Sequence, residues 1–217
     1  MKGKIYLYSF ITLGLVIQVV TFLLMPHDSW LSLVSGCLGI CSVCLAAQGK
    51  ISTYAFGFAQ VITYTILCIQ QRFYGAVGIN IYYFITMIYG VYVWKKRLAK
   101  SEEGLEVTPR HLSRSLMVLL AVLTLVFSAL TGWGLSAWTN DTQPFLDAYT
   151  TVPALVAQVL MILAYREHWF IWLAVDVLSV IIWLRAGDYC MAAQYTFWCA
   201  NCLYGMKRWF TISNRQL

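Results

Sequence analysis

Eight long apolar runs constrain this chain more than any other feature of its sequence. A helix needs about 20 apolar residues to cross the hydrocarbon core of a bilayer, and each run has about that length. The runs lack the alternating pattern of transmembrane β-barrel strands. They predict an all-α integral membrane protein with helices over 5–25, 30–47, 51–70, 74–94, 113–138, 144–164, 168–184 and 189–209.

The composition supports this class of protein. Hydrophobic residues make up 60% of the chain and charged residues only 11%, whereas soluble domains are about 25% charged. The first run lacks a small-residue cleavage site, so we expect a retained transmembrane helix and not a signal peptide.

The basic residues predict how the chain is oriented. If the N-terminus is cytoplasmic and the chain crosses eight times, all 15 lysines and arginines except Arg72 and Arg185 lie on the cytoplasmic side. This asymmetry follows the positive-inside rule. The net charge of +6 is then a signal of topology and not of nucleic-acid binding. Both termini are expected in the cytoplasm.

The longest polar stretch, 95–112, divides the chain into halves that resemble each other. YGVYVW, which ends at Trp94, matches YGMKRW, which ends at Trp209, 115 residues later. Three crossings per repeat and one linker helix give both repeats the same orientation, as in transporters built from parallel repeats. We therefore predict one membrane domain with an extra N-terminal helix (1–29), repeat 1 (30–94), a cytoplasmic loop and linker helix (95–143), repeat 2 (144–209) and a C-terminal tail (210–217).

Two further pairs align within the predicted repeats. Gln60 falls opposite Asp176 and Lys50 falls opposite Arg166, each pair 116 residues apart. A single residue gained in the turn would reconcile this separation with that of the tryptophans. The alignment places Gln60 and Asp176 at equivalent depths, where both face the central space in which such transporters bind their substrates.

Asp176 lies at the middle of a predicted membrane helix. An ionisable side chain at this depth costs about 3 kcal/mol on insertion scales, so it lines a cavity or pairs with another group. No lysine or arginine lies at a comparable depth. The alternative is that Asp176 is protonated and only bridges helices by hydrogen bonds. Asp176 and the deep amides of both repeats together predict a polar chamber. Its lining would be Gln60, Asn80, Asp176, Gln194 and Asn201.

Two tryptophans precede this acid on the same helix face, because Trp169 and Trp172 are three residues apart and Asp176 is four further on. The alternative for Trp169, and for the adjacent His168, is a place at the membrane interface, where aromatic residues are enriched. Aromatic rings over a cavity favour a planar ligand, and a cationic one especially.

The seven cysteines all lie in apolar runs, where a free thiol behaves as a small hydrophobic group. Cys199 and Cys202 have CxxC spacing, but no second pair or histidine cluster accompanies them, so we expect no metal site and no cofactor. The usual enzyme motifs are absent. The alternative class is a membrane-embedded oxidoreductase or transferase that uses Cys199 and Cys202 or Asp176.

These features resemble the PnuC-type vitamin transporters, whose best-known members carry nicotinamide riboside. The most specific piece of the resemblance is a WxxWxxx(N/D) motif, present as Trp169, Trp172 and Asp176. In the family this motif is implicated in binding the sugar of the substrate. The resemblance extends over most of 30–209 and includes LAAQGKISTYAFGFAQVITY (45–64), YGAVGINIYYFITMIYGVYVW (74–94) and the stretch 144–177.

The resemblance implies a fold and a mechanism. The family has a three-plus-one-plus-three helix arrangement similar to that of SWEET sugar transporters, and its members are homotrimeric facilitators of the bacterial inner membrane. Alternating access then moves the vitamin, and a separate cytoplasmic kinase traps it by phosphorylation. Many relatives begin the first core helix with a Trp-Glu pair, whereas this chain has Ser29-Trp30-Leu31. Gln60, Asn80, Gln194 and Asn201 are expected among the cavity-lining residues.

The resemblance leaves several substrates open, because relatives also carry thiamine, riboflavin or deoxynucleosides. A deep carboxylate with aromatic rings favours a ligand that carries a fixed positive charge on an aromatic ring. Nicotinamide riboside is therefore the first expectation and thiamine the second. Proton-coupled symport with Asp176 as the proton carrier is the alternative to passive transport.

Overall fold

The computed structural model describes residues 2–24, 29–70, 74–99, 106–139, 143–186 and 189–214, and within these ranges the chain forms eight α-helices and no strand. The helices, in chain order, are α1 (Lys2–Leu24), α2 (Trp30–Ala47), α3 (Thr53–Gln70), α4 (Tyr74–Leu98), α5 (Arg114–Trp138), α6 (Pro144–Ile162), α7 (His168–Ala186) and α8 (Tyr189–Asn214).

The helices lie where the apolar runs predict them, with shifts at some ends. α4 continues past Trp94 to Leu98, and α8 continues past Trp209 to Asn214, so part of the predicted tail 210–217 is helical. Within the described residues, α1, α2, α4, α5, α6 and α7 are long and apolar enough to cross a membrane, judged by length and composition. The more polar α8 packs against α1, α2 and α7, which cover much of its surface.

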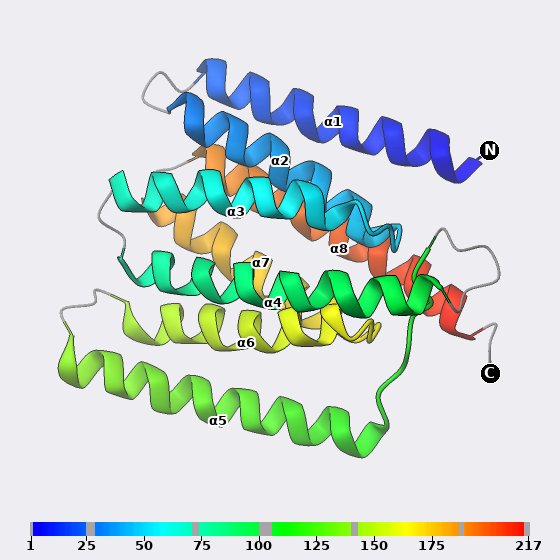
Figure 1. The fold of residues 1–217 in the computed structure, drawn as a ribbon. Helices are drawn as coiled ribbons and strands as arrows, with labels where there is room; N and C mark the ends of the chain where they lie inside the picture. The colour runs from blue at the N-terminus through cyan, green and yellow to red at the C-terminus, as the bar shows by residue number, and fades with distance from the viewer. Residues whose placement is uncertain are drawn as a thin grey trace.

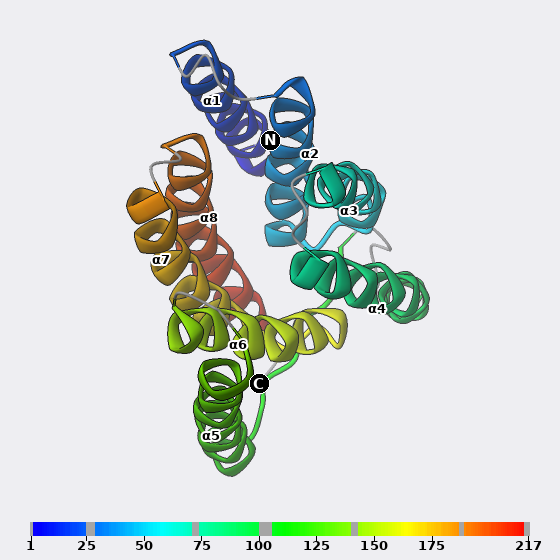
Figure 2. The same ribbon diagram turned by 90° about the vertical axis from the view of Figure 1, so that its left-hand side faces the viewer.

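The helices pack side by side, with α1 and α5 at opposite edges of the bundle (Figures 1 and 2). We call α2–α4 the first unit and α6–α8 the second unit, because consecutive helices within each pack against each other. The units meet at two contacts, α2 against α8 and α4 against α6. α1 packs on the contact between α2 and α8, whereas α5 packs on α6. The six helices of the two units therefore surround the centre of the molecule.

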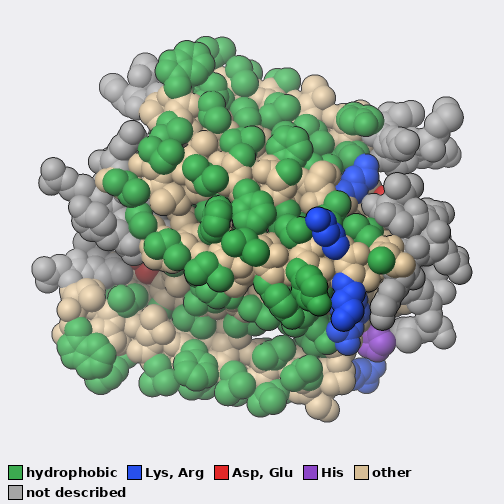
Figure 3. Space-filling view, viewed as in Figure 1, with side chains coloured by type: hydrophobic (Ala, Val, Ile, Leu, Met, Phe, Trp, Pro, Cys, Tyr) green, Lys and Arg blue, Asp and Glu red, His purple; other side chains and the backbone are tan. Residues whose placement is uncertain are grey.

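Most of the described basic side chains gather at one end of the bundle, the end at which both chain termini lie (Figures 1 and 3). We call this the basic end. It includes the α2–α3 turn and the α6–α7 turn. Its described lysines and arginines are Lys50, Lys95, Lys96, Arg97, Arg110, Arg114, Arg166, Lys207 and Arg208.

The two turns at the basic end have the same backbone geometry. Gly49 and Ala164, which are 115 residues apart, both have positive φ, 68° and 57°. The Gly49 N–H donates to Ala46 O, and the Ala164 N–H donates to Met161 O, each over 2.9 Å. Lys50 therefore matches Tyr165, and its predicted pairing with Arg166 is wrong by one residue. Because the separation is 115 residues at these turns as well as at the tryptophans, the additional turn residue that the sequence alignment required is not needed.

Two tryptophans join the units across the basic end. Trp94 Nε1 of α4 donates to Ile162 O of α6 over 3.1 Å. Trp209 Nε1 of α8 donates to Ala47 O of α2, also over 3.1 Å. Each tryptophan thus satisfies a carbonyl that the last turn of a helix leaves without an intrahelical partner. We call these contacts the two tryptophan bridges, and both indole rings are fully buried.

Candidate functional site

A cavity of about 390 Å³ lies between the two units. This volume falls within the range of about 300–1,000 Å³ that is typical of small-molecule sites. Within the described part of the chain, its walls come from α2, α3, α4, α6, α7 and α8 and not from α1 or α5. The structure brings all seven predicted site residues to this one cavity: Gln60, Asn80, Trp169, Trp172, Asp176, Gln194 and Asn201.

Asp176 lies on the wall that α7 contributes and is 2% exposed. Its Oδ2 accepts a hydrogen bond from Cys202 Sγ of α8 over 3.3 Å. Its Oδ1 has no hydrogen-bond partner among the residues that the structure describes. Asp176 therefore bridges two helices with one oxygen, and its other oxygen is a buried acceptor without a partner among the described residues.

Trp172 and Trp169 lie on the same wall, about one and two turns nearer the basic end than Asp176, respectively. Trp169 is only 3% exposed, so its alternative placement in an aromatic belt facing lipid is wrong. Its ring packs against Gly205 and Trp209, and its Nε1 lacks a partner within the described ranges. His168 beside it is also fully buried, since its ring packs on Trp209. Its Nδ1 forms a hydrogen bond with Tyr165 O over 2.6 Å.

The predicted amides occupy the surrounding walls. Asn201 Nδ2 donates to Val43 O of α2 over 3.1 Å, and its Oδ1 has no partner in the described part of the chain. Gln194 and Gln60 approach each other at Gly39, since a Cβ on that glycine would lie 3.6 Å from Gln194 Nε2 and 3.5 Å from Gln60 Cγ. The amides of both units thus converge on one space.

Sequence reasoning did not assign Tyr54 and Trp198 to the site, although both line the cavity. The Tyr54 hydroxyl and Trp198 Nε1 are buried and have no partner in the ranges described above. Alignment of the two repeats at a separation of 115 residues would have identified Tyr54, because it places Tyr54 opposite the predicted site residue Trp169. Of the ten buried side-chain atoms that lack a partner among the described residues, five belong to residues that line this cavity: Tyr54, Trp169, Asp176, Trp198 and Asn201. Such groups are rare in proteins, so their number here marks the cavity as a candidate ligand site.

The described walls of the cavity contain acidic side chains and no basic ones. Two carboxyl groups line it, Asp176 at mid-depth and Asp147 near the end opposite the basic end. Among the described lining residues there is no lysine, arginine or histidine. Aromatic rings line it as well: Tyr54, Tyr64, Tyr83, Trp169, Trp172, Trp183, Tyr195 and Trp198. Such a cavity favours a cation, through the carboxylates and the faces of the rings.

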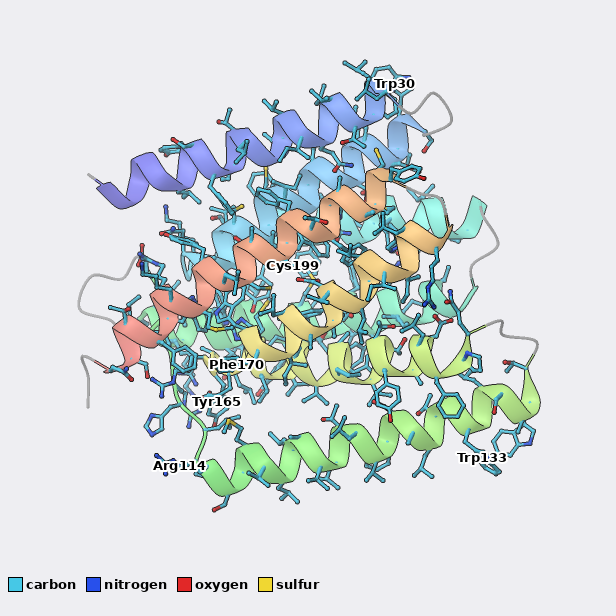
Figure 4. The ribbon with its side chains drawn as sticks, turned by 180° about the vertical axis from the view of Figure 1, so that it is seen from behind. Trp30, Arg114, Trp133, Tyr165, Phe170 and Cys199 are labelled. Atoms are coloured by element: carbon cyan, nitrogen blue, oxygen red, sulfur yellow. The ribbon has the colours of Figure 1, made fainter. Side chains whose placement is uncertain are left out.

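The cavity is closed at the basic end and reaches towards the other. At the basic end, the rings of Trp94, Trp209 and His168 fill the space behind Tyr54 and Trp169. The opposite end is lined by partly exposed residues, among them Ser32 and Asp147. In Figure 4, Cys199 marks the middle of α8, between Trp30 and Trp133 at the opposite end and Tyr165 and Arg114 at the basic end. The described part of the cavity therefore extends from the ring layer at the basic end to partly exposed residues at the opposite end.

Comparisons with known proteins agree on one family. The profile of the nicotinamide mononucleotide transporter family matches residues 29–211. The nicotinamide riboside transporter PnuC of Haemophilus influenzae is 31% identical over 206 residues, which cover 94% of this chain and 89% of that protein. PnuC of Escherichia coli is 29% identical over 203 residues, covering 83% and 85%. The riboflavin/roseoflavin transporter RibM of Streptomyces davaonensis is 26% identical over 196 residues, covering 87% and 88%.

A solved structure resembles the whole fold. The crystal structure of the vitamin B3 transporter PnuC superposes on this chain with a TM-score of 0.83 at 30% sequence identity. The match covers 97% of this chain and 92% of that one, so it includes α1 as well as the six helices around the cavity.

Proposed function

Because this chain belongs to the family of PnuC-type vitamin transporters, we propose that it takes up nicotinamide riboside, the vitamin B3 form that serves as a precursor of NAD. It is a multi-pass membrane protein and a transporter, and it is not an enzyme, since its relatives are transporters. The family profile is named for the mononucleotide and the relatives for the riboside, and the charge of the cavity distinguishes the two.

The observation that favours the riboside as the substrate is the charge of the cavity walls. The mononucleotide adds a phosphate, which proteins bind with arginine, lysine or a helix N-terminus. The described walls offer Asp147 and Asp176 and no basic side chain. A phosphate would be repelled by both carboxylates, whereas the pyridinium cation of the riboside is attracted by them. Thiamine, which is also a cation, is the second candidate substrate.

We assign substrate binding to Trp169, Trp172, Asp176, Gln60, Asn80, Gln194 and Asn201. The aromatic rings suit the faces of a planar pyridinium. Amides and a carboxylate suit ribose hydroxyls, which both donate and accept hydrogen bonds. The free Oδ1 of Asp176 and Oδ1 of Asn201 support this role, because each is a buried acceptor without a partner among the described residues.

The transport mechanism that we propose is passive alternating access by two parallel three-helix repeats, α2–α4 and α6–α8, joined by α5. The equal geometry of the two turns and the two tryptophan bridges supports the repeat. The basic residues support a cytoplasmic location of the basic end and of both termini in the bacterial inner membrane. In this orientation, the ring layer that closes the basic end lies on the cytoplasmic side of the cavity. A homotrimer and trapping of the product by a cytoplasmic kinase complete the proposal.

The test of the substrate is calorimetric titration of the purified protein with nicotinamide riboside, nicotinamide mononucleotide, thiamine, riboflavin and a deoxynucleoside. We expect binding of the riboside and much weaker binding of the mononucleotide. Tighter binding of the mononucleotide or of riboflavin than of the riboside would contradict the proposal.

The test of the site is the Trp172→Ala variant, with Cys37→Ala as the matched control, because Cys37 does not line the cavity. Loss of one cation–π contact should weaken riboside binding by roughly tenfold. The control should bind as the unmodified protein does. Equal affinities of the two variants would remove Trp172 from the site.

Two further measurements test the mechanism. In proteoliposomes, an imposed pH gradient should not drive accumulation of unmodified riboside, and accumulation would establish proton coupling. Replacement of both Cys199 and Cys202 by serine should leave uptake in place, whereas a redox role for the CxxC pair predicts its loss.

A further inference from the structure

The two units place different residue pairs at matching positions of the cavity wall. At the separation of 115 residues that the turns define, Asp176 and Cys202 of the second unit match Val61 and Met87 of the first. All four line the cavity and all four are buried. An acid and a thiol thus stand where the first unit has two apolar side chains. Packing alone does not require them, because the first unit fills the same place with a valine and a methionine.

The thiol and the acid contact each other directly. Cys202 Sγ lies 3.3 Å from Asp176 Oδ2 and donates to it, so the bond joins α8 to α7. Cys202 is 3% exposed and Asp176 is 2% exposed, which excludes bulk water from competing for this contact. A carboxyl group has two oxygens, and this bond occupies one of them. The other, Oδ1, is buried and has no partner in the part of the chain described here, on a residue that lines the cavity.

A single fixed hydrogen bond has a geometric consequence. The side chain of aspartate rotates about χ1 and about the broad χ2 torsion, and an unbonded carboxyl group would sample several orientations. A donor on the neighbouring helix selects the orientation in which Oδ2 points at α8 and Oδ1 is left without a partner among the described residues. If the Asp176 side chain is already ordered before the ligand binds, less conformational entropy is lost on binding.

We propose that Cys202 is a positioning residue that holds Asp176 so that Oδ1 alone is presented to the substrate. This inference rests on the proposed function, because it assigns a partner to the acid of that same site. The two groups act as one element of the second unit, and Cys202 contributes to affinity through Asp176 and not as one half of a CxxC redox pair. The free Oδ1 is the observation, independent of the cysteine, that indicates a ligand at this point.

The experiment compares Cys202→Ala with Cys202→Ser, because alanine removes the donor and serine keeps one. Affinity for nicotinamide riboside is measured by calorimetry, and the thermal unfolding midpoint without ligand is measured in parallel. We expect Cys202→Ala to weaken binding by roughly tenfold, the size expected for loss of one hydrogen bond to a charged group. Cys202→Ser should bind within roughly threefold of the unmodified protein, as a hydroxyl donor replaces the thiol.

The matched control is Cys44→Ala, since Cys44 is equally buried but is not among the cavity-lining residues. It should leave the affinity unchanged, even if its unfolding midpoint falls as much as that of Cys202→Ala. Unchanged affinity of Cys202→Ala, an equal loss in Cys202→Ser, or an equal loss in Cys44→Ala would each overturn the positioning role. If the unmodified protein binds the riboside and Cys202→Ala does too, only this inference fails. If the unmodified protein does not bind it, the proposed function fails with it.

Discussion

Tyr54 of the first unit and Trp169 of the second unit occupy matching places beneath the cavity. Each ring packs against a glycine of a neighbouring helix, Gly90 or Gly205, where an added Cβ would lie 2.6 Å from the nearest ring atom in both cases. Each also meets a bridging tryptophan edge to face, with an interplanar angle of 83° in both units. Beyond these rings the units diverge. The first unit continues with Gly57 and Val61 and the second with Trp172 and Asp176.

The two units therefore share a scaffold but not the chemistry of the site. The turns, glycines and tryptophans must match, because each unit closes half of the basic end against the other. The deep acid has no such constraint, since one carboxylate is sufficient to attract one cation. A second carboxylate facing the first would add its own insertion cost and would repel the first. The second unit therefore carries the charge alone.

The largest effect is expected from Asp176→Val, which gives the second unit the residue of the first. Loss of a buried charged acceptor should weaken riboside binding by about 1.5–3 kcal/mol, or roughly 10- to 100-fold. The protein should not become less stable to heat, because a deep acid is removed. Calorimetry and thermal unfolding measure the two quantities. Normal affinity of this variant would remove Asp176 from the site and with it the contrast between the units.

The next largest effect is expected from Gly205→Ala and Gly90→Ala, which test the part of the scaffold that matches. Overpacking should lower the free energy of unfolding by about 1–3 kcal/mol in each variant. The two losses should be similar, because the two rings are equally close. Gly78→Ala is the control, since a Cβ there meets nothing within 4 Å. Thermal unfolding measures both losses, and a much larger loss in one variant than in the other would contradict the equivalence of the two units.

A smaller effect is expected from Trp94→Phe and Trp209→Phe, which each remove one tryptophan bridge. A lost hydrogen bond to a buried carbonyl should cost about 1 kcal/mol of stability, with a similar value in both units. Denaturant unfolding of the two single variants measures it. A cost confined to one of them would show that the basic end is held together by one unit.

The smallest effect is expected from Asp147→Asn at the partly exposed end of the cavity. A carboxylate at this place attracts the cationic substrate as it enters, so its neutralisation should slow association by roughly two- to fivefold and leave dissociation unchanged. Stopped-flow binding at low and high salt measures both rates. The difference between the variant and the unmodified protein should shrink at high salt, because salt screens exposed charges. A change in the dissociation rate would instead assign Asp147 to the bound complex.

Sequence reasoning identified the helices and the set of polar residues but not their partners. Gln60 and Asp176 were recognisable because an amide or an acid is costly at mid-membrane, whatever the fold around it. Their predicted equivalence is off by one residue, because the turns place Val61 opposite Asp176. The burial of His168 and Trp169 could not be predicted from the sequence either. A ring near the end of a membrane helix can face lipid or a neighbouring helix, and the sequence pattern is the same in both cases.

What the sequence by itself determined is the class of protein, the eight helices and the depth of each polar side chain. Hydropathy and length set all three, because the bilayer acts as a solvent that each segment meets independently. Only the tertiary structure decided that α2, α3, α4, α6, α7 and α8 enclose one cavity, that each tryptophan bridge crosses to the other unit, and that Cys202 contacts Asp176. These contacts depend on the rotation and register of helices far apart in the chain, which the hydropathy of a single helix does not encode.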